Sequence, residues 1–391
     1  MSASRRAPRS PIAFWLPVAI IGWAGFVLIA MQLASLDPSR LGDDLRLLVD
    51  AGTRWRDGAP LYDPVPPGTS LAAESLFYSY PPVVAQAMSL VAGVPFPAIY
   101  VTWTAGAVAG LWLVAVRLGR DGRAVAFPAL ALAPFLYPLA VALLMGNVNA
   151  WFPAAFGLVL AAVLVAGRGW TLTGGSALAL ATVAKLHPAS LGIWLLVRGV
   201  RDARSGRSGS ALLVLAVAAT VGLGLLAVSL AVGGIAPWAD YVAFLRESSG
   251  AADVVSPLNV GPASQIALAL DLSDATARTL QVGITSAALV GTAIAAWAID
   301  DRVESFAWAT VASLVILPVT WFHYPVALVP VALVAASRAR DGGFARTTAL
   351  LAAAIVTAAL AILAPALVWV AAAFVIAATR TSRDVAGETN P

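Results

Sequence analysis

The sequence contains no cysteine. Without cysteine the chain forms no disulfide and offers neither a thiolate metal site nor a thiol nucleophile. Charged residues are also scarce, because Asp, Glu, Lys and Arg make up 11% of the chain, far below the roughly 25% of soluble domains. Hydrophobic residues reach 60% instead. A single soluble core does not account for this composition.

Long apolar runs recur along the chain from Ile12 to Ala378. Each is about 17 to 25 residues long, enough to cross a hydrocarbon layer of about 30 Å as a helix. A transmembrane β-barrel would show short alternating segments with a polar inner face, whereas the runs over 212–232 and 350–361 are continuous. The sequence therefore predicts an all-α polytopic membrane protein.

The N-terminus combines Arg5, Arg6 and Arg9 with an apolar run over 12–33. This run is longer than the apolar part of a cleaved signal peptide and no A-x-A site follows it, so we expect a retained anchor helix. The pI near 9.7 does not indicate nucleic-acid binding. The arginines are dispersed among short loops between helices, as membrane topology alone produces.

The arginines orient the predicted helices, because basic residues favour cytoplasmic loops. They predict about 12 helices in the plasma membrane with both termini in the cytoplasm. Most of the 24 Lys and Arg residues then lie inside, and most of the 20 Asp and Glu residues lie outside. The prediction is one domain over 1–391, with cytoplasmic tails 1–11 and 380–391, outer loops 35–96 and 233–275, and helices over 12–34, 97–117, 124–145, 148–166, 170–185, 188–198, 209–232, 276–299, 303–320 and 323–337, followed by two more that end at Arg380 and Arg383.

The apolar stretch 82–117 allows either two crossings or a surface helix followed by one crossing. Two crossings would leave the three arginines at 117, 120 and 123 outside. We therefore predict an interfacial helix over 82–94 on the outer surface and one crossing over 97–117. Because proline is tolerated in the first turn of a helix, Pro81 and Pro82 mark the start of the interfacial helix.

Polar side chains that do not suit a lipid-facing helix collect at the predicted outer ends of the helices. For any one of them an interfacial anchor or a satisfied turn is an equally good explanation, but chance would spread them over both faces. They comprise Asp43 and Asp44, the segment Asp57 to Asp63 with Tyr62, the segment Tyr78 to Pro82 with Tyr80, Asn147 and Asn149, Lys185 to Pro188 with His187, Asn259 with Ser264 and Gln265, and Trp321 to Tyr324 with His323.

Lys185 is the only lysine in the chain, and His187 and His323 are the only histidines. All three fall on the predicted outer face. A compact ammonium suits an anionic phosphate, and a histidine can donate to a phosphate oxygen or pass a proton. A structural ion pair at the lysine and interfacial hydrogen bonds at the histidines are the alternatives.

Asp43 and Asp44 follow the first helix closely enough to lie at the membrane surface. A carboxylate there can accept the proton of a sugar hydroxyl, although Asp is also a favoured helix N-cap. One residue can cap while its neighbour catalyses. Metal binding by these aspartates and the histidines stays open, but no H-x-x-x-H spacing appears, so no metal site is predicted.

The order of these motifs resembles the GT-C superfamily of membrane glycosyltransferases, and within it glycosyltransferase family 87. The motifs are an Asp after the first helix, an acidic loop ending in G-x-x-x-Y-D, then Y-P-P, G-N-x-N, K-x-x-P and W-x-H-Y. The family includes polyprenyl-phosphate-mannose-dependent α-mannosyltransferases, among them a phosphatidylinositol mannoside mannosyltransferase.

The resemblance implies a GT-C fold and an inverting transfer of a sugar, mannose, from a polyprenyl phosphate to a glycolipid or polysaccharide hydroxyl outside the membrane. It implies Asp44 as general base, although Leu48 stands where the family pattern has tyrosine. Lys185 and His187 would hold the lipid phosphate, and His323 would bind or activate it. No cofactor, nucleotide sugar or nucleic acid is implied. The other residues assigned to substrate binding are Asp43, Tyr62, Tyr80, Asn147, Asn259, Trp321 and Tyr324.

A transporter or flippase of a lipid-linked sugar is the main alternative, because it would share the helices, a cavity and the phosphate contacts. Transporters carry ionisable residues near the bilayer midplane, whereas the predicted helix centres here are almost uncharged. A catalytically silent scaffold would not depend on Asp44. The sequence favours the enzyme.

Overall fold

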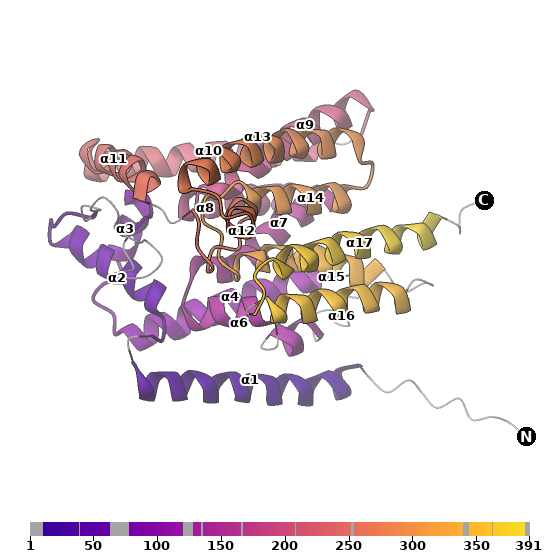
Figure 1. The fold of residues 1–391 in the computed structure, drawn as a ribbon, viewed down its shortest axis with the longest axis horizontal. Helices are drawn as coiled ribbons and strands as arrows, with labels where there is room; N and C mark the ends of the chain where they lie inside the picture. Colours follow the sequence, from indigo (N-terminus) through magenta and orange to yellow (C-terminus); the bar gives the residue numbers. More distant parts are fainter. Residues whose placement is uncertain are drawn as a thin grey trace, which may run out of the picture.

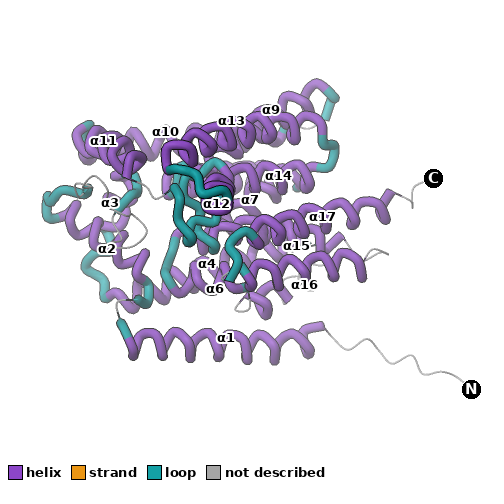
Figure 2. Tube along the Cα trace, viewed as in Figure 1, coloured by secondary structure: helices purple, strands orange, loops and turns teal. Residues whose placement is uncertain are grey.

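The computed structural model describes residues 11–38, 40–62, 78–119, 128–133, 136–165, 167–207, 209–251, 254–338, 344–361 and 363–387. Within these ranges the chain forms helices joined by loops and no strand, as predicted (Figure 2). The N-terminal arginines, Asp63, Arg120, Arg123 and Arg340 lie outside the described ranges, so the expectations that involve them stay predictions.

The helices form a bundle and run back and forth along its long axis (Figure 1). Its members are α1 (Pro11–Leu36), α4 (Phe96–Leu118), α6 (Tyr137–Leu144), α7 (Phe152–Leu164), α8 (Arg168–Ala184), α9 (Leu191–Arg204), α10 (Ser210–Gly233), α13 (Asp274–Ala298), α14 (Arg302–Val315), α15 (Val329–Arg338), α16 (Phe344–Leu360) and α17 (Leu367–Gly387). Short 3₁₀ turns precede three of them: η2 (Val148–Trp151), η3 (His187–Ser190) and η4 (Tyr324–Leu328). Consecutive helices such as α7 and α8, or α16 and α17, pack against each other.

Local sequence signals set the starts of several helices. The Ser273 hydroxyl accepts a bond from the Thr276 amide (3.3 Å) and caps α13. The Asp301 carboxylate accepts bonds from the amides of Val303 (2.7 Å) and Glu304 (2.9 Å) and caps α14. These side chains satisfy amide groups that have no partner inside the helix.

Four helices, α1, α4, α10 and α13, are long and apolar enough to cross a membrane. Large apolar side chains project from them, as at Ile21 (70% exposed) and Val282 (67%). Such surfaces suit lipid better than water. Shorter apolar helices occupy Val148–Leu164, Tyr324–Arg338, Arg346–Leu360 and Leu367–Arg380. The chain is thus a helical membrane protein, while the total of about 12 crossings stays a prediction.

Some predicted helix bounds are wrong. The predicted helix 124–145 is interrupted, because Leu136 is extended and α6 begins only at Tyr137; Pro138 has no amide hydrogen to continue an earlier helix. The predicted helix 303–320 ends at Val315, three residues before a proline. In contrast, the predicted short helix 188–198 continues as α9 to Arg204.

The predicted outer loops are also partly helical. The first contains α2 (Asp43–Arg56) and α3 (Pro82–Ser89), and the second contains α11 (Ala236–Ala251) and α12 (Pro262–Ala269). Pro82 is the first residue of α3, as predicted, and a single long helix, α4, follows. Together α2, α3 and α11 cover one end of the bundle, at the left of Figure 1, which we call the capped end.

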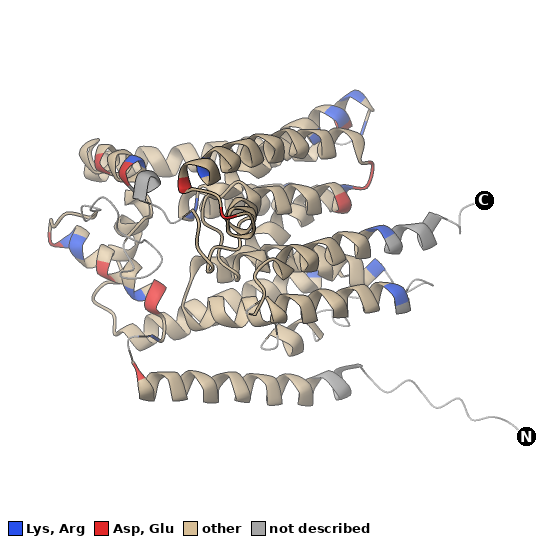
Figure 3. Ribbon diagram, in the orientation of Figure 1, with Lys and Arg blue, Asp and Glu red and all other residues tan. Residues whose placement is uncertain are grey.

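Charged residues gather on the helices at the opposite end, where α9 ends and α14 begins (Figure 3), and ion pairs join the helices there. Asp202 of α9 pairs with Arg198 (3.4 Å), Arg207 (3.5 Å) and Arg302 (2.8 Å). Additional ion pairs join Arg338 to Asp301 (2.7 Å), Arg380 to Glu304 (2.6 Å) and Arg201 to Asp300. We call this the arginine-rich end. Its ion pairs join α9, α14, α15 and α17.

Candidate functional site

Asp44 is held at the start of α2 by the backbone of the chain before η2. The Gly42 amide donates to the Leu144 carbonyl (2.8 Å), and the Asp44 amide donates to the Met145 carbonyl (3.0 Å). The cap residue of α2 is Gly42, at φ +72°, and no side chain caps the helix. The alternative that Asp43 or Asp44 serves as N-cap is therefore wrong, because both lie within the first turn and leave their carboxylates available.

Asn147 fixes the Asp44 carboxylate. Its Nδ2 donates to Asp44 Oδ2 at 2.6 Å, and its Oδ1 accepts from the Asn149 amide at 2.8 Å. The preceding Gly146 has φ +64°, and a Cβ there would lie 2.6 Å from the Leu45 Cβ. The glycine thus lets this turn approach α2 closely. The G-N-x-N motif serves to bring an amide side chain onto the aspartate.

Lys185 lies in the loop that follows α8 and reaches Tyr324 at the start of η4. Its Nζ donates to the Tyr324 hydroxyl at 2.8 Å and lies 4.1 Å from the centre of the ring. Lys185 is half-buried, and its charge acts electrostatically on Asp44. The two segments that carry the only lysine and a tyrosine of the W-x-H-Y motif therefore meet beside the aspartate.

The two histidines stand on either side of Tyr324. The His187 ring is parallel to the Tyr324 ring, with centres 6.2 Å apart, and the His323 ring meets it edge-on at 5.0 Å. His187 is 4% exposed and His323 is 7% exposed. No nitrogen of either imidazole makes a hydrogen bond of normal geometry in the part of the chain that the structure describes, although the Ser313 backbone lies close enough to His187 to interact with it. Unsatisfied buried polar groups cost free energy, so both rings are suited to a ligand.

Asn149 is a further buried polar group at this site. Its side chain is fully buried and lies near the Tyr324 hydroxyl, yet its amide atoms make no hydrogen bond of normal geometry among the described residues. Asn149 was not among the residues assigned to substrate binding. Its unpartnered amide could be found only from the structure, because the motif G-N-x-N does not reveal which asparagine is satisfied.

Burial shifts the pKa values of the ionisable groups at the site. It raises the pKa of Asp44, while the Asn147 bond and the Lys185 charge act in the opposite direction. Burial lowers the pKa of Lys185 to about 7. Burial and the Lys185 charge lower the pKa of both His187 and His323 to about 3. The histidines are neutral at neutral pH, and each then has one donor and one acceptor nitrogen.

Tyr80 links this group to an aromatic cluster under the capped end. It lies close enough to Asp44 and Tyr324 to interact with both electrostatically. The Tyr62 hydroxyl donates to the Tyr80 carbonyl at 2.9 Å. The Tyr62 ring in turn packs against Tyr241 and Phe244 of α11, with ring centres 5.7 and 5.4 Å apart. Tyr62 thus lies beside the site, and its contact with substrate stays a prediction.

Besides Tyr62, three other predicted site residues lie outside the group around Asp44, Lys185 and Tyr324. Asp43 interacts with Arg46, Asp37 and Arg40 rather than with Lys185. The Asn259 amide is fully engaged, since Nδ2 donates to the carbonyls of Val254 and Pro318 and Oδ1 accepts from the amides of Gly261 and Thr320. Trp321 packs against the main hydrophobic core. The structure gives Asn259 a role in joining two loops; its contact with substrate stays a prediction.

The structure therefore brings six predicted site residues from distant parts of the chain together around Asp44 and Tyr324, with Tyr80 next to both. They are Asp44, Asn147, Lys185, His187, His323 and Tyr324. The group combines a carboxylate, an ammonium and two neutral imidazoles. This combination can accept a proton from one ligand and stabilise negative charge on another.

Comparison with known proteins gives one result. Residues 78–322 match the model of glycosyltransferase family 87, more than half of the chain. The matched range includes Tyr80, Asn147, Lys185 and His187 and ends one residue before His323. No curated protein and no solved structure matches.

Proposed function

Because the chain belongs to glycosyltransferase family 87, we propose that it transfers mannose from a polyprenyl phosphate to a hydroxyl of a glycolipid or polysaccharide. Family membership makes it a membrane glycosyltransferase with a sugar donor and an acceptor. The identities of sugar, carrier lipid and acceptor class are part of the proposal, as are the GT-C fold and the outer location of the site. The proposal rests on the arrangement of Asp44 near Lys185 and near two histidines whose nitrogens make no hydrogen bond of normal geometry among the described residues.

Asp44 is the proposed general base. Its carboxylate is oriented by the 2.6 Å bond from Asn147 and remains half-buried, so that an acceptor hydroxyl can reach it. Burial raises the pKa of Asp44, which makes its carboxylate a stronger base than an exposed one. The acceptor oxygen would lose its proton to Asp44 as it bonds to the anomeric carbon. The bond from that carbon to the phosphate oxygen breaks, and the configuration inverts.

Lys185, His187 and His323 would receive the phosphate that leaves. The ammonium supplies a positive charge, and each neutral imidazole can donate one hydrogen bond. Among the described residues, the Tyr324 hydroxyl contacts Lys185 and the Ser313 backbone interacts with His187, but no imidazole nitrogen makes a hydrogen bond of normal geometry. Donors that are already in place stabilise developing negative charge without reorganisation. Asn149 and Tyr324 complete the polar lining of this part of the site.

A transporter of a lipid-linked sugar is not favoured. Family membership indicates transfer rather than transport. In addition, the cationic groups that could hold a phosphate lie next to a carboxylate positioned for proton abstraction, an arrangement that transport alone does not require.

The proposal is tested by transfer of radiolabelled mannose from polyprenyl-phosphate-mannose in membranes that contain the wild type or Asp44→Asn. A general base contributes typically about 100- to 10,000-fold to the rate, so we expect the variant to lose at least that lower factor. Asp43→Asn is the matched control, because Asp43 precedes it on the same helix and faces arginines. Undiminished transfer by Asp44→Asn would exclude the assigned base. Activity with a different labelled polyprenyl-phosphate sugar, and none with mannose, would change the donor assignment.

A further inference from the structure

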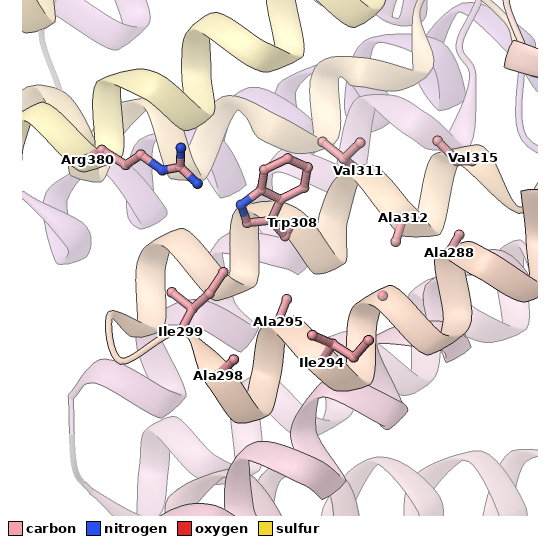
Figure 4. A pocket seen from close by; sticks show the side chains of 11 residues that line it. Ala288, Ile294, Ala295, Ala298, Ile299, Trp308, Val311, Ala312, Val315 and Arg380 are labelled. Atoms are coloured by element: carbon pink, nitrogen blue, oxygen red, sulfur yellow. The ribbon is translucent and has the colours of Figure 1, made fainter.

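An apolar groove runs between α13 and α14 (Figure 4). Its volume is about 480 Å³. Residues of α13 such as Gly291 and Ala295 line one side, and residues of α14 such as Trp308 and Val311 line the other. Ile294 and Trp308 are 59% and 39% exposed, which shows that the groove opens outward.

The groove ends at one charged side chain, Arg380 of α17. The Arg380 Nε donates to Glu304 at 2.6 Å, which fixes the guanidinium while its side chain stays 57% exposed. This bond uses one of the five N–H donors of arginine. The remaining lining consists of apolar side chains and glycine.

The dimensions match one leaflet of a bilayer. The α13 lining extends from Ile299 to Ala288, which at about 1.5 Å per residue is roughly 16 Å. Half of a hydrocarbon core of about 30 Å is roughly 15 Å. One extended hydrocarbon chain that enters from the membrane surface at Arg380 would therefore end near the middle of the bilayer.

We propose that this groove binds one acyl chain of an anionic phospholipid from the surrounding bilayer, with Arg380 holding the headgroup phosphate. Charge favours an anionic headgroup, because no carboxylate of the described residues lines the groove and Glu304, the partner of Arg380, is only 9% exposed whereas the Arg380 side chain is 57% exposed.

The carrier lipid of the sugar donor fits the groove less well. The phosphate of that donor belongs beside Lys185, at the capped end, whereas Arg380 is at the other end of α17. Trp369, near the N-terminus of α17, donates a hydrogen bond to the Val260 carbonyl near the site. Arg380 lies eleven residues farther along the same helix, which corresponds to roughly 17 Å. The choice of a phospholipid over the carrier lipid rests on the proposed function, whereas lipid binding in the groove can be measured without the transfer reaction.

Native mass spectrometry of the purified protein can test the site with phosphatidylglycerol and phosphatidylcholine that have identical acyl chains. We expect one retained phosphatidylglycerol and weaker retention of phosphatidylcholine. Arg380→Gln should reduce the preference about fivefold, because one arginine near an anionic surface contributes about 1 kcal/mol. Arg346→Gln, on α16, is the matched control and should leave the preference unchanged. Equal retention of both lipids by the wild type would overturn the headgroup assignment.

Two glycines of α13 provide a test of the acyl-chain site. Gly291 lines the groove and Gly283 does not, and a Cβ added at either meets no atom within 4 Å. Gly291→Leu should fill the groove and abolish lipid retention, whereas Gly283→Leu should retain the lipid. Retention by both variants, or displacement of phosphatidylglycerol by equimolar polyprenyl phosphate, would overturn the proposal. If Gly291→Leu fails to fold, the Arg380→Gln comparison still decides the headgroup contact.

Discussion

At the scale of single residues, we expect the proposed binding of the donor phosphate to depend on the charge of Lys185. Burial lowers its pKa to about 7, so its ammonium is only partly populated at neutral pH. The lysine is fully charged well below that pH and loses its charge as the pH rises through it. Donor phosphate binding should follow the same direction.

We therefore expect the KM for the polyprenyl-phosphate donor to rise as the pH increases from about 6 to about 8. Lys185→Arg should remove this pH dependence, because arginine stays charged throughout the range. The measurement is the donor KM across this pH range for both proteins. A donor KM that is independent of pH in the wild type would contradict the assignment of Lys185 to the phosphate.

The rare residue types of the sequence identified much of this site. A single lysine and two histidines were predicted to lie on one face, and the structure places all three around Tyr324. Composition could not show that Asn259 is fully engaged while Asn149 is unpartnered. Both are buried asparagines in loop motifs, and only the positions of neighbouring carbonyl and amide groups distinguish them.

At the scale of helices, the position of Asp44 depends on the contact between α2 and α3. Gly52 of α2 lies against the backbone of α3, and a Cβ there would lie 2.6 Å from the Met88 carbonyl carbon. Backbone atoms cannot turn aside as a flexible side chain can. Any side chain at position 52 must therefore separate the two helices, and Asp44 lies on the helix that would move.

Gly52→Ala should destabilise the protein by about 1 to 3 kcal/mol, as overpacking of a core typically does, and should lower transfer activity. The unfolding temperature in detergent measures the first effect. Gly25→Ala on α1 is the control, because a Cβ there has no atom within 4 Å. Equal unfolding temperatures of Gly52→Ala and the wild type would show that the two helices are not held at this distance.

Hydrophobicity predicted the long helices well and the short ones poorly. The predicted span 209–232 matches α10, and 276–299 matches α13 to within two residues, because each is a long apolar run. In contrast, α11 and α12 lie in a segment expected to be a loop. Their formation depends on packing against neighbours such as Tyr62 and Val254, which a pattern along the sequence does not contain.

At the scale of the whole molecule, the buried ion pairs of the arginine-rich end hold the bundle together. The Asp202 side chain is 1% exposed and contacts three arginines. Asp202→Asn would leave buried positive charge without its partner, and removal of one member of a buried pair typically costs about 3 to 5 kcal/mol.

Asp300→Asn is the matched control, because Asp300 is 78% exposed in its pair with Arg201 and an exposed pair contributes about 0 to 1 kcal/mol. We expect Asp202→Asn to lower the unfolding temperature in detergent much more than Asp300→Asn does. Equal effects of the two changes would mean that Asp202 is not buried in the folded protein.

The orientation in the membrane is a prediction for the whole chain, and the absence of cysteine makes it testable. Ala59 follows α2 at the capped end, and Ser205 follows α9 at the arginine-rich end; both are exposed. In intact cells a membrane-impermeant thiol reagent should label Ala59→Cys, and it should label Ser205→Cys only after the membrane is opened. The reverse pattern would place the site on the cytoplasmic side.

The dispersal of the site residues along the chain has a consequence for biosynthesis. Asp44 and Tyr324 are separated by roughly 280 residues, and at about 5 to 20 residues per second a ribosome needs roughly 15 to 60 s to make that stretch. During this time the nascent protein has its aspartate but lacks the His323 and Tyr324 segment. A chain released early therefore has no complete site, and an abandoned translation product would not transfer sugar in the membrane.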